Sequence, residues 1–233
     1  MHRAGHVEPS DGSDLIGREV TAIVPAPRAP ERMRIKIGRR TAAELDRADV
    51  EHLELRVGTV WSDALARRAE SAAEIERARR AVLRVLARRA ASRRQIAEKL
   101  RLAGFSAEAA EAALAHFQAQ GLIDDDAYAE AAARSIVARK ATGRELLVSS
   151  LRARGVDAET ARRAAAAALE DRDVAADALT LARQKARSMP ADLDEHARRR
   201  RVYAQLARRG FSPEVCRNAV DQALGVGQGS DPD

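Results

Sequence analysis

Between residues 20 and 37 the chain alternates apolar and polar side chains in the manner of β-strands. Val20, Ile23 and Val24 form one short β-favouring run, and residues 33–37 read Met-Arg-Ile-Lys-Ile. Strict alternation over such a run is typical of a strand with one buried face. The segment 25–32 between the two runs contains three prolines and predicts a stiff loop. The sequence therefore predicts a β-hairpin.

Two short helices, over residues 41–47 and 49–55, are expected to follow the hairpin, and residues 57–60 (Val-Gly-Thr-Val) are expected to form a turn. These elements predict a small N-terminal domain over residues 18–61. Residues 1–17 before it are polar, rich in Gly, Ser and Asp and without periodicity, and we interpret them as a disordered tail.

From residue 62 to 224 the period changes to that of helices, and one motif recurs three times. The motif L-x3-G-[FV]-[SD]-x-E begins at Leu100, Leu151 and Leu206, and its glycines are 51 and 55 residues apart. A recurrence of this spacing indicates tandem repeats of one supersecondary unit. The repeats are therefore more informative than any single helix.

Each position of the motif has a mechanical explanation. Its glycine can adopt the left-handed conformation that ends a helix, and the following Phe or Val can pack back onto that helix. The Ser or Asp after it caps the next helix, and the Glu lies in the first turn, where the helix dipole favours a carboxylate. The motif predicts a helix–corner–helix unit, and we assign its glycines to structure: Gly104, Gly155 and Gly210.

Capping patterns mark the start of the second helix in each repeat. We expect capping boxes at Ser92 with Gln95 and at Thr142 with Glu145, and a looser equivalent begins at Asp192. Apolar stripes before and after these helices supply a first and a third helix. The resulting divisions are repeat 1 with a lead-in helix at residues 62–124, repeat 2 at 125–173, repeat 3 at 174–224 and a second disordered tail at 225–233.

The predicted fold class is mainly α: three tandem three-helix-bundle repeats, preceded by the small β-hairpin-containing domain. Aromatic residues make up 3% of the chain, and alanine supplies about half of its hydrophobic residues. Each core is therefore expected to be thin, so that stacked repeats support one another in an elongated, curved array.

Reactive groups do not converge anywhere in the sequence. Phosphate-binding glycine motifs and the H-E-x-x-H zinc motif are absent. The cluster Asp124, Asp125 and Asp126 lies between two apolar helix patterns, so we interpret it as helix capping rather than a metal site. Cys216 falls within an apolar helical pattern and is expected to be a buried hydrophobe. We expect no catalysis, no metal and no cofactor.

The sequence also limits where the protein acts. No stretch approaches the roughly 20 apolar residues that span a membrane, and the first twenty residues contain no apolar secretory region. We expect a cytoplasmic protein without membrane contact. A monomer is expected because no spare apolar surface is evident.

Arginine carries the remaining functional signal. The chain has 41 Lys and Arg against 35 Asp and Glu, a net charge of +6 that does not choose between nucleic acid and an acidic protein as partner. Equivalent windows of the three repeats, residues 84–101, 134–154 and 198–209, hold 19 of these cations and only two acids. We predict a basic ridge for partner or DNA binding, formed by Arg88, Arg89, Arg93, Arg94, Arg101, Arg144, Arg152, Arg154, Arg198, Arg199, Arg208 and Arg209.

A solvated helix face is the simpler interpretation of any one of these windows. Three windows in register favour a binding surface for phosphates or for an acidic protein groove. Few aromatic residues lie among the arginines, so stacking on single-stranded bases has little support.

These motifs resemble the bacterial RecX family, whose members modulate the RecA recombinase. The resemblance covers about residues 20–224 and rests on residues 86–106, 121–134 and 206–212, including the Gly-Phe-Ser corners. Two departures are small: Ala90 replaces a common proline, and Tyr128 replaces a usual Phe. The family's three tandem three-helix repeats agree with those predicted from the pattern.

The resemblance implies a non-enzymatic regulator that binds the RecA filament on single-stranded DNA and suppresses ATP hydrolysis, strand exchange and coprotease activity. It implies RecA as the main partner, with single-stranded or duplex DNA as a secondary one. The alternative is a helical DNA-binding protein that acts on nucleic acid directly. A repeat scaffold for another partner is a third hypothesis.

Overall fold

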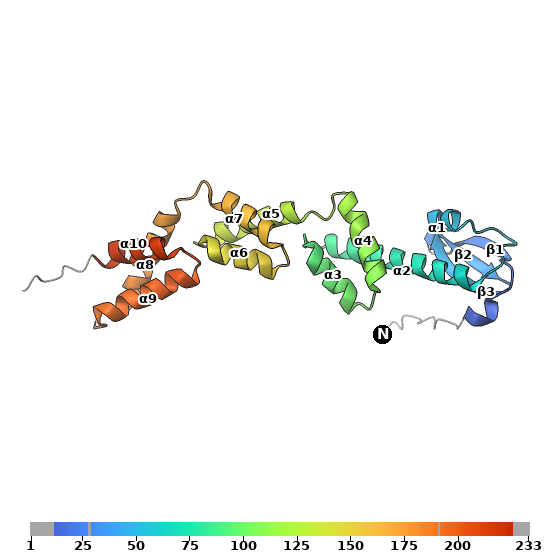
Figure 1. Cartoon of the computed structure of the whole chain (residues 1–233), viewed down its shortest axis with the longest axis horizontal. Helices are drawn as coiled ribbons and strands as arrows, with labels where there is room; N and C mark the ends of the chain where they lie inside the picture. The colour runs from blue at the N-terminus through green and yellow to red at the C-terminus, as the bar shows by residue number, and fades with distance from the viewer. Residues whose placement is uncertain (1–11, 28, 191, 226–233) are drawn as a thin grey trace, which may run out of the picture. The chain divides into compact units, whose positions relative to one another are not determined.

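The computed structural model describes residues 12–27, 29–190 and 192–225. The chain divides into two compact units, of which the first contains residues 1–88 and 97–117 and the second contains residues 89–96 and 118–233. The described elements are a short 3-10 helix η1 (Gly12–Leu15), the strands β1 (Ala22–Ala26), β2 (Ala29–Ile37) and β3 (Arg40–Asp46), and the helices α1 (Arg47–His52), α2 (Asp63–Leu86), α3 (Arg93–Leu102), α4 (Ala107–Ala119), α5 (Asp125–Arg139), α6 (Arg144–Ala153), α7 (Ala158–Leu169), α8 (Val174–Arg187), α9 (Glu195–Arg208) and α10 (Pro213–Leu224) (Figure 1).

The predicted hairpin is confirmed as part of a three-stranded antiparallel sheet with the order β1-β2-β3. Ile23 pairs with Ile35, and the two strands continue until Ala26 pairs with Ala29. The proline-rich segment therefore contributes more to the strands than to the loop. Alternation along β2 places Ile35 and Ile37 in the core, where both are almost completely buried.

The predicted helix over residues 41–47 is wrong, because most of this segment forms β3. Gly38 adopts a positive φ of 62° in the turn after β2, and the chain returns so that Ile35 pairs with Ala43 and Met33 with Leu45. Pairing with β2 and burial of Leu45 outweigh the helix propensity of alanine and glutamate in this segment.

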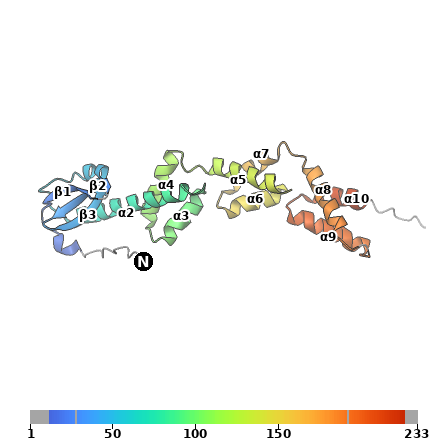
Figure 2. The ribbon, with the colours of Figure 1, turned by 180° about the vertical axis from the view of Figure 1, so that it is seen from behind.

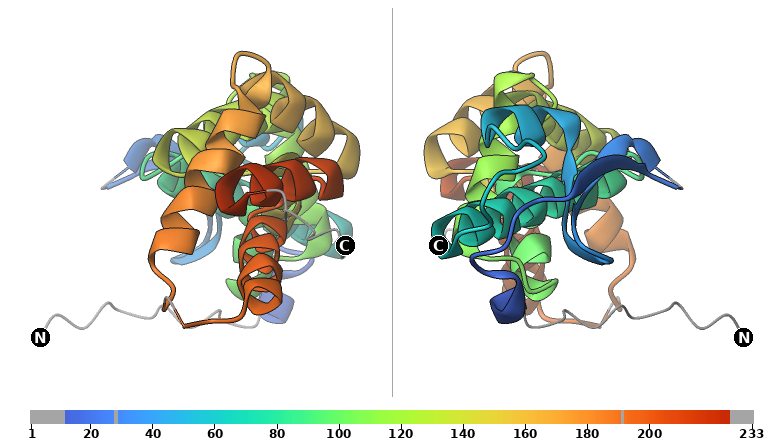
Figure 3. Two further views of the ribbon diagram at one scale, coloured as in Figure 1. Left: turned by 90° about the vertical axis from the view of Figure 1, so that its left-hand side faces the viewer. Right: turned by 90° about the vertical axis from the view of Figure 1, so that its right-hand side faces the viewer.

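One apolar core joins the sheet to the helices around it. Its members include Trp61, the chain's one tryptophan, which is 3% exposed, and Ala69 from α2. Both α1 and α2 lie against the sheet (Figure 3). Leu15 of η1 is also buried in this core, so the predicted tail is wrong for residues 12–17. The rest of that tail, and residues 226–233 of the second one, lie outside the described residues.

A side-chain bond to a helix start gives the first unit a pH-dependent contact. The Glu74 carboxylate of α2 accepts hydrogen bonds from the backbone N–H and the hydroxyl of Ser106, each at 2.8 Å. The backbone bond first, and then the hydroxyl bond, lowers the pKa of Glu74 below its usual 4.5. Ser106 in turn caps α4 through a 3.2 Å bond from the N–H of Ala109.

Because folding lowers this pKa, the contact contributes its full stability at pH values above the pKa of Glu74 in the unfolded state. This contribution is lost as the pH falls through the pKa of Glu74 in the folded state. We expect Glu74→Gln to reduce the loss of thermal stability between about pH 5 and pH 3, measured as melting temperature against pH. Glu70→Gln, at an exposed position of the same helix, is the control. Identical pH profiles for Glu74→Gln and the wild type would contradict the prediction.

The three predicted corners are confirmed. Gly104, Gly155 and Gly210 have φ values of 83°, 90° and 77°. After each glycine, the next N–H bonds the carbonyl of the motif leucine, at 3.2 Å for Phe105 to Leu100. This bond is the helix-ending arrangement that a left-handed glycine permits.

Helices α5–α7 and α8–α10 form two three-helix bundles with separate cores within the second unit (Figure 2). More than half of the buried residues in the α5–α7 core are alanines, which pack around Leu147 and Leu151. The α8–α10 core contains Phe211 and Cys216 as well as small residues. Small side chains let the helices approach closely, so the cores are thin, as the composition predicts.

Candidate binding surface at the joints between repeats

Most arginines of the predicted ridge are exposed, but not all of them are available for a partner. The exposed members are Arg88, Arg89, Arg94, Arg101, Arg144, Arg152, Arg154 and Arg208. The half-buried members are Arg93, Arg198, Arg199 and Arg209.

Contacts inside the protein explain two of the half-buried side chains. Arg199 of α9 forms an ion pair with Asp221 of α10 and donates a 3.0 Å hydrogen bond to the carbonyl of Gly225. Arg209 donates a 3.2 Å hydrogen bond to the carbonyl of Ala141, in the preceding repeat. These two arginines therefore hold the fold together, which a count of charges along the sequence does not reveal.

The contact of Arg209 belongs to a joint between the second and third repeats. Here the corner of repeat 3 meets the start of α6, and the N–H of Gly143 donates to the carbonyl of Arg209 at 2.8 Å. The N–H of Glu145 donates to the carbonyl of Gly210 at 3.1 Å. A side chain on Gly210 would lie only 2.6 Å from Cβ of Leu146, so the two backbones touch directly.

An equivalent joint connects the start of α3 to the corner of repeat 2. We call this one the first joint, and the joint between the corner of repeat 3 and the start of α6 the second joint. The buried hydroxyl of Ser92 donates a 2.6 Å hydrogen bond to the carbonyl of Arg154, the residue before the corner glycine. The same hydroxyl accepts the N–H of Gln95 at 3.2 Å and so caps α3, as predicted. A side chain on Gly155 would lie 2.7 Å from Cβ of Arg94. Each joint thus uses the carbonyl that precedes a corner glycine.

The other two predicted capping positions are wrong. Gly143 is the N-cap of α6, while the buried Thr142 hydroxyl donates to the carbonyl of Lys140 at 3.0 Å. Glycine occupies the cap because the corner of repeat 3 leaves no room for a side chain there. In repeat 3 the cap is Asp194 rather than Asp192, and it accepts the N–H of Ala197 at 2.9 Å.

The aspartate cluster has the capping role that its position predicts. Asp124 is the N-cap of α5, and Asp126 forms an ion pair with Arg163. Asp125 reaches out of its own repeat and accepts the backbone N–H of Arg93, the first residue of α3, at 2.7 Å. It is therefore a further part of the first joint.

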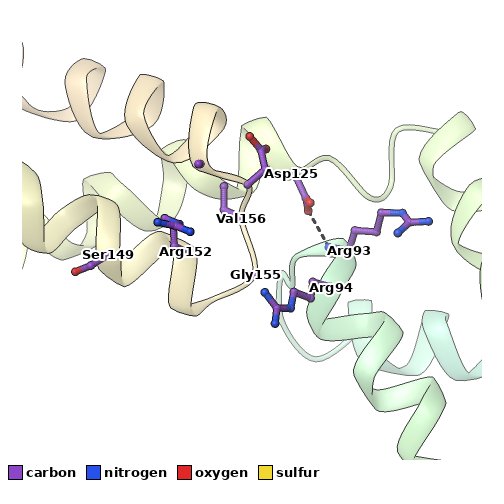
Figure 4. Close-up of a pocket in the computed structure, with 9 residues that line it drawn as sticks. Arg93, Arg94, Asp125, Ser149, Arg152, Gly155 and Val156 are labelled. Atoms are coloured by element: carbon purple, nitrogen blue, oxygen red, sulfur yellow. Dashed lines mark hydrogen bonds between the residues drawn. The ribbon is translucent and has the colours of Figure 1, made fainter.

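A cleft of about 630 Å³ opens beside the first joint (Figure 4). It is lined by Arg93, Arg94, Asp125, Ser149, Arg152, Gly155, Val156, Asp157 and Ala158. Figure 4 shows the side chain of Arg93 extending away from those of Arg94 and Arg152, and its Nε donates to Oε1 of Gln118 at 3.0 Å.

Asp157 contributes a second carboxylate to the cleft, and it too is used by a helix start. It caps α7 by accepting the N–H groups of Glu159 and Thr160 at 2.9 and 3.0 Å. The bonds from Thr160 are the main cause that lowers the pKa of this carboxyl below 3.8. The Asp157 side chain is therefore an ionised cap in the folded protein.

Other chemistry finds no support in the part of the chain that the structure describes. Within those residues, no group of three or more His, Cys, Asp or Glu side chains is arranged to hold a metal ion. Cys216 is buried as predicted, and its burial raises the pKa of the thiol. Among the described helices, none combines the length and apolar character that crossing a membrane requires.

The joints themselves could not be read from the sequence alone, because they depend on contacts between residues 32 to 68 positions apart. The available signal was a glycine, Gly143, at the position where repeat 1 has the polar cap Ser92. Aligning the capping positions relative to the corner glycines would have identified Ser92 and Gly143 as equivalent. That alignment points to a shared role for the two positions.

Comparisons with known proteins agree with the repeat architecture. Family models described as the first and third three-helix domains of RecX match residues 78–117 and 172–220. The chain is 36% identical over 150 residues to the regulatory protein RecX of Streptomyces coelicolor, covering 64% of this chain and 79% of the relative. It is 36% identical over 151 residues to the regulatory protein RecX of Thermobifida fusca, with the same coverage.

Solved structures show the same fold. A crystal structure of regulatory protein RecX superposes with a TM-score of 0.75 at 23% identity, covering 87% of this chain and 98% of that one. The structure of RecX from Lactobacillus salivarius gives a TM-score of 0.58 at 19% identity, covering 64% and 96%. These relatives are named regulatory proteins rather than enzymes. With its three-helix repeats and these sequence relatives, the chain belongs to the RecX family of regulatory proteins.

Proposed function

We propose that this protein binds the RecA recombinase and its filament on single-stranded DNA, and inhibits RecA ATPase, strand exchange and coprotease activity. Family membership supports a regulatory role. The observation that carries the proposal is the set of exposed arginines in equivalent windows of the three repeats, around the starts and ends of the second helices. Such a surface complements the charge of an acidic protein groove and of DNA phosphates.

Titrating the protein into a RecA ATPase assay on single-stranded DNA tests the proposal directly. We expect ATP hydrolysis to fall with increasing protein and to reach a plateau once the filament is saturated. An ATPase rate that stays constant up to a large molar excess would overturn the proposal and favour a scaffold for another partner.

Charge reversal tests whether the arginines carry the binding. We expect Arg144→Glu with Arg208→Glu to raise the concentration for half-inhibition of the ATPase by roughly tenfold or more, because each change places a like charge against an acidic surface. Both side chains are exposed, so the melting temperature should change little. Arg209 is left intact because it bonds the Ala141 carbonyl.

The matched control is Arg183→Glu with Arg187→Glu, two exposed arginines of α8 outside the predicted ridge. This control should inhibit like the wild type. Equal losses in the two double variants would mean that net charge, rather than the ridge, determines inhibition.

Direct action on DNA is the second candidate function, and the exposed arginines also favour it. Salt separates the two functions, because counterion release makes DNA binding fall steeply with salt concentration. Binding to RecA filaments should persist at salt concentrations where binding to bare single strands is lost. Equal affinities for filament and bare DNA at physiological salt would favour the direct function.

A further inference from the structure

The cleft at the first joint is built from two repeats at once. Arg94 comes from the first turn of α3, Arg152 from the last turn of α6, and residues 155–158 from the corner of repeat 2. Its volume of about 630 Å³ lies within the range of roughly 300–1,000 Å³ that is usual for ligand sites. It is large enough for one or a few side chains of a partner.

The charges of the cleft favour an anion near Arg94 and Arg152. Both side chains are exposed, and neither forms an ion pair with another of the described residues that line the cleft. The two carboxylates of the cleft, Asp125 and Asp157, are already bonded to backbone N–H groups. The first turns of α3 and α7 also line the cleft, and helix N-termini carry partial positive charge.

The second joint shows that the arginines are not needed to connect two repeats. The position ten residues before the corner glycine holds Arg94 in repeat 1 and Glu145 in repeat 2. The position three residues before the corner glycine holds Arg152 in repeat 2 and Ala207 in repeat 3. The second joint nevertheless closes through backbone bonds. A purely structural role therefore does not explain Arg94 and Arg152.

The mixture of charges distinguishes between possible occupants. A DNA strand brings a phosphate at every nucleotide, so neighbouring phosphates would approach Asp125 and Asp157 as well as the arginines. A protein segment can place one carboxylate between neutral peptide groups, and it can also cover the half-buried side chain of Ala158. Arginine is well suited to this partner, since its guanidinium binds a carboxylate through two parallel hydrogen bonds.

We propose that the cleft at the first joint receives an acidic side chain of the protein partner, with its carboxylate bound by Arg94 and Arg152. The partner is taken to be the RecA filament, so this inference rests on the proposed function. The cleft then acts as a protein-recognition site within a surface whose other arginines contact phosphates or protein alike. It also makes recognition depend on the joint, because the two arginines come from different repeats.

The test compares full-length wild type with Arg94→Gln plus Arg152→Gln in two binding assays at the same salt concentration. One assay uses RecA filaments on single-stranded DNA, and the other uses a bare oligothymidylate of the same length. We expect the double variant to bind filaments roughly tenfold more weakly and to bind the oligonucleotide within threefold of the wild type. Arg183→Gln with Arg187→Gln, the control on α8, should change neither affinity.

Each other result overturns the inference. Unchanged filament binding by the double variant would remove the cleft from recognition while leaving the proposed function intact. Parallel losses in both assays would make the cleft a DNA site. A wild-type protein that fails to bind filaments would overturn the proposed function, and this occupant with it. Arg152→Gln alone, at an exposed position outside the joint's backbone bonds, repeats the test if the double variant has a lowered melting temperature.

Discussion

Replacing Gly210 with valine should lower the free energy of unfolding of the second unit by about 4 kcal/mol, the sum of two separate costs. The first is conformational, because Gly210 has a φ of 77° and a β-branched residue is strained there. The second is steric, because the new Cβ would meet the backbone and Cβ of Leu146 at the start of α6. These atoms of Leu146 belong to a helix that is packed within repeat 2, so they cannot move aside without breaking the joint.

Gly104→Val is the matched control for this prediction. Gly104 occupies the same motif position with a φ of 83°, but a Cβ there would meet nothing within 4 Å. Only the conformational cost of about 1–2 kcal/mol remains at that site. Urea unfolding followed by far-ultraviolet circular dichroism measures both variants. Equal losses at the two positions would show that contact between the repeats does not contribute to stability.

Local structure was predictable from the sequence where a short motif determines it. The corners depend on a left-handed glycine followed by a capping side chain, and both requirements lie within a few neighbouring residues. The same holds for Asp124 at the start of α5 and for the alternation along β2. In each of these places, local propensity and the final fold agree.

Where partners are distant in the sequence, prediction fails for physical reasons. The segment of β3 has good helix formers, and only its pairing with β2 makes it a strand. Thr142 has the right chemistry for a cap, but the approach of Gly210 selects Gly143 in its place. Leu15 lies in a polar, aperiodic segment and is nevertheless buried against the N-terminal core.

The arginines show the same limit at the level of function. Counting charges in equivalent windows identifies a basic region but gives every cation the same weight. The structure separates Arg199 and Arg209, which bond within the protein, from Arg94 and Arg152, which line the cleft. This distinction depends on tertiary contacts, within repeat 3 for Arg199 and between repeats for Arg209, so it requires the structure to be known.

Ser92→Ala should test how far the first joint supports that cleft. The substitution removes the helix cap of α3, a loss of about 1 kcal/mol, and leaves the Arg154 carbonyl without its bond from the Ser92 hydroxyl. This acceptor is only partly buried, so its loss falls in the lower part of the range of about 1–3 kcal/mol that an unsatisfied buried acceptor costs, and we expect a total loss of about 2–3 kcal/mol in the free energy of unfolding. Urea unfolding of the full chain measures it.

Ser212→Ala provides the comparison, because Ser212 caps α10 by accepting the N–H of Val215 at 3.3 Å and is exposed. It should lose only the capping contribution of about 1 kcal/mol. Ser92→Ala should also weaken filament binding although no arginine is changed, since Arg94 and Arg152 keep their relative positions only while the joint is closed. If Ser92→Ala costs no more stability than Ser212→Ala and binds filaments like the wild type, the hydroxyl bond is not what holds the two repeats in register.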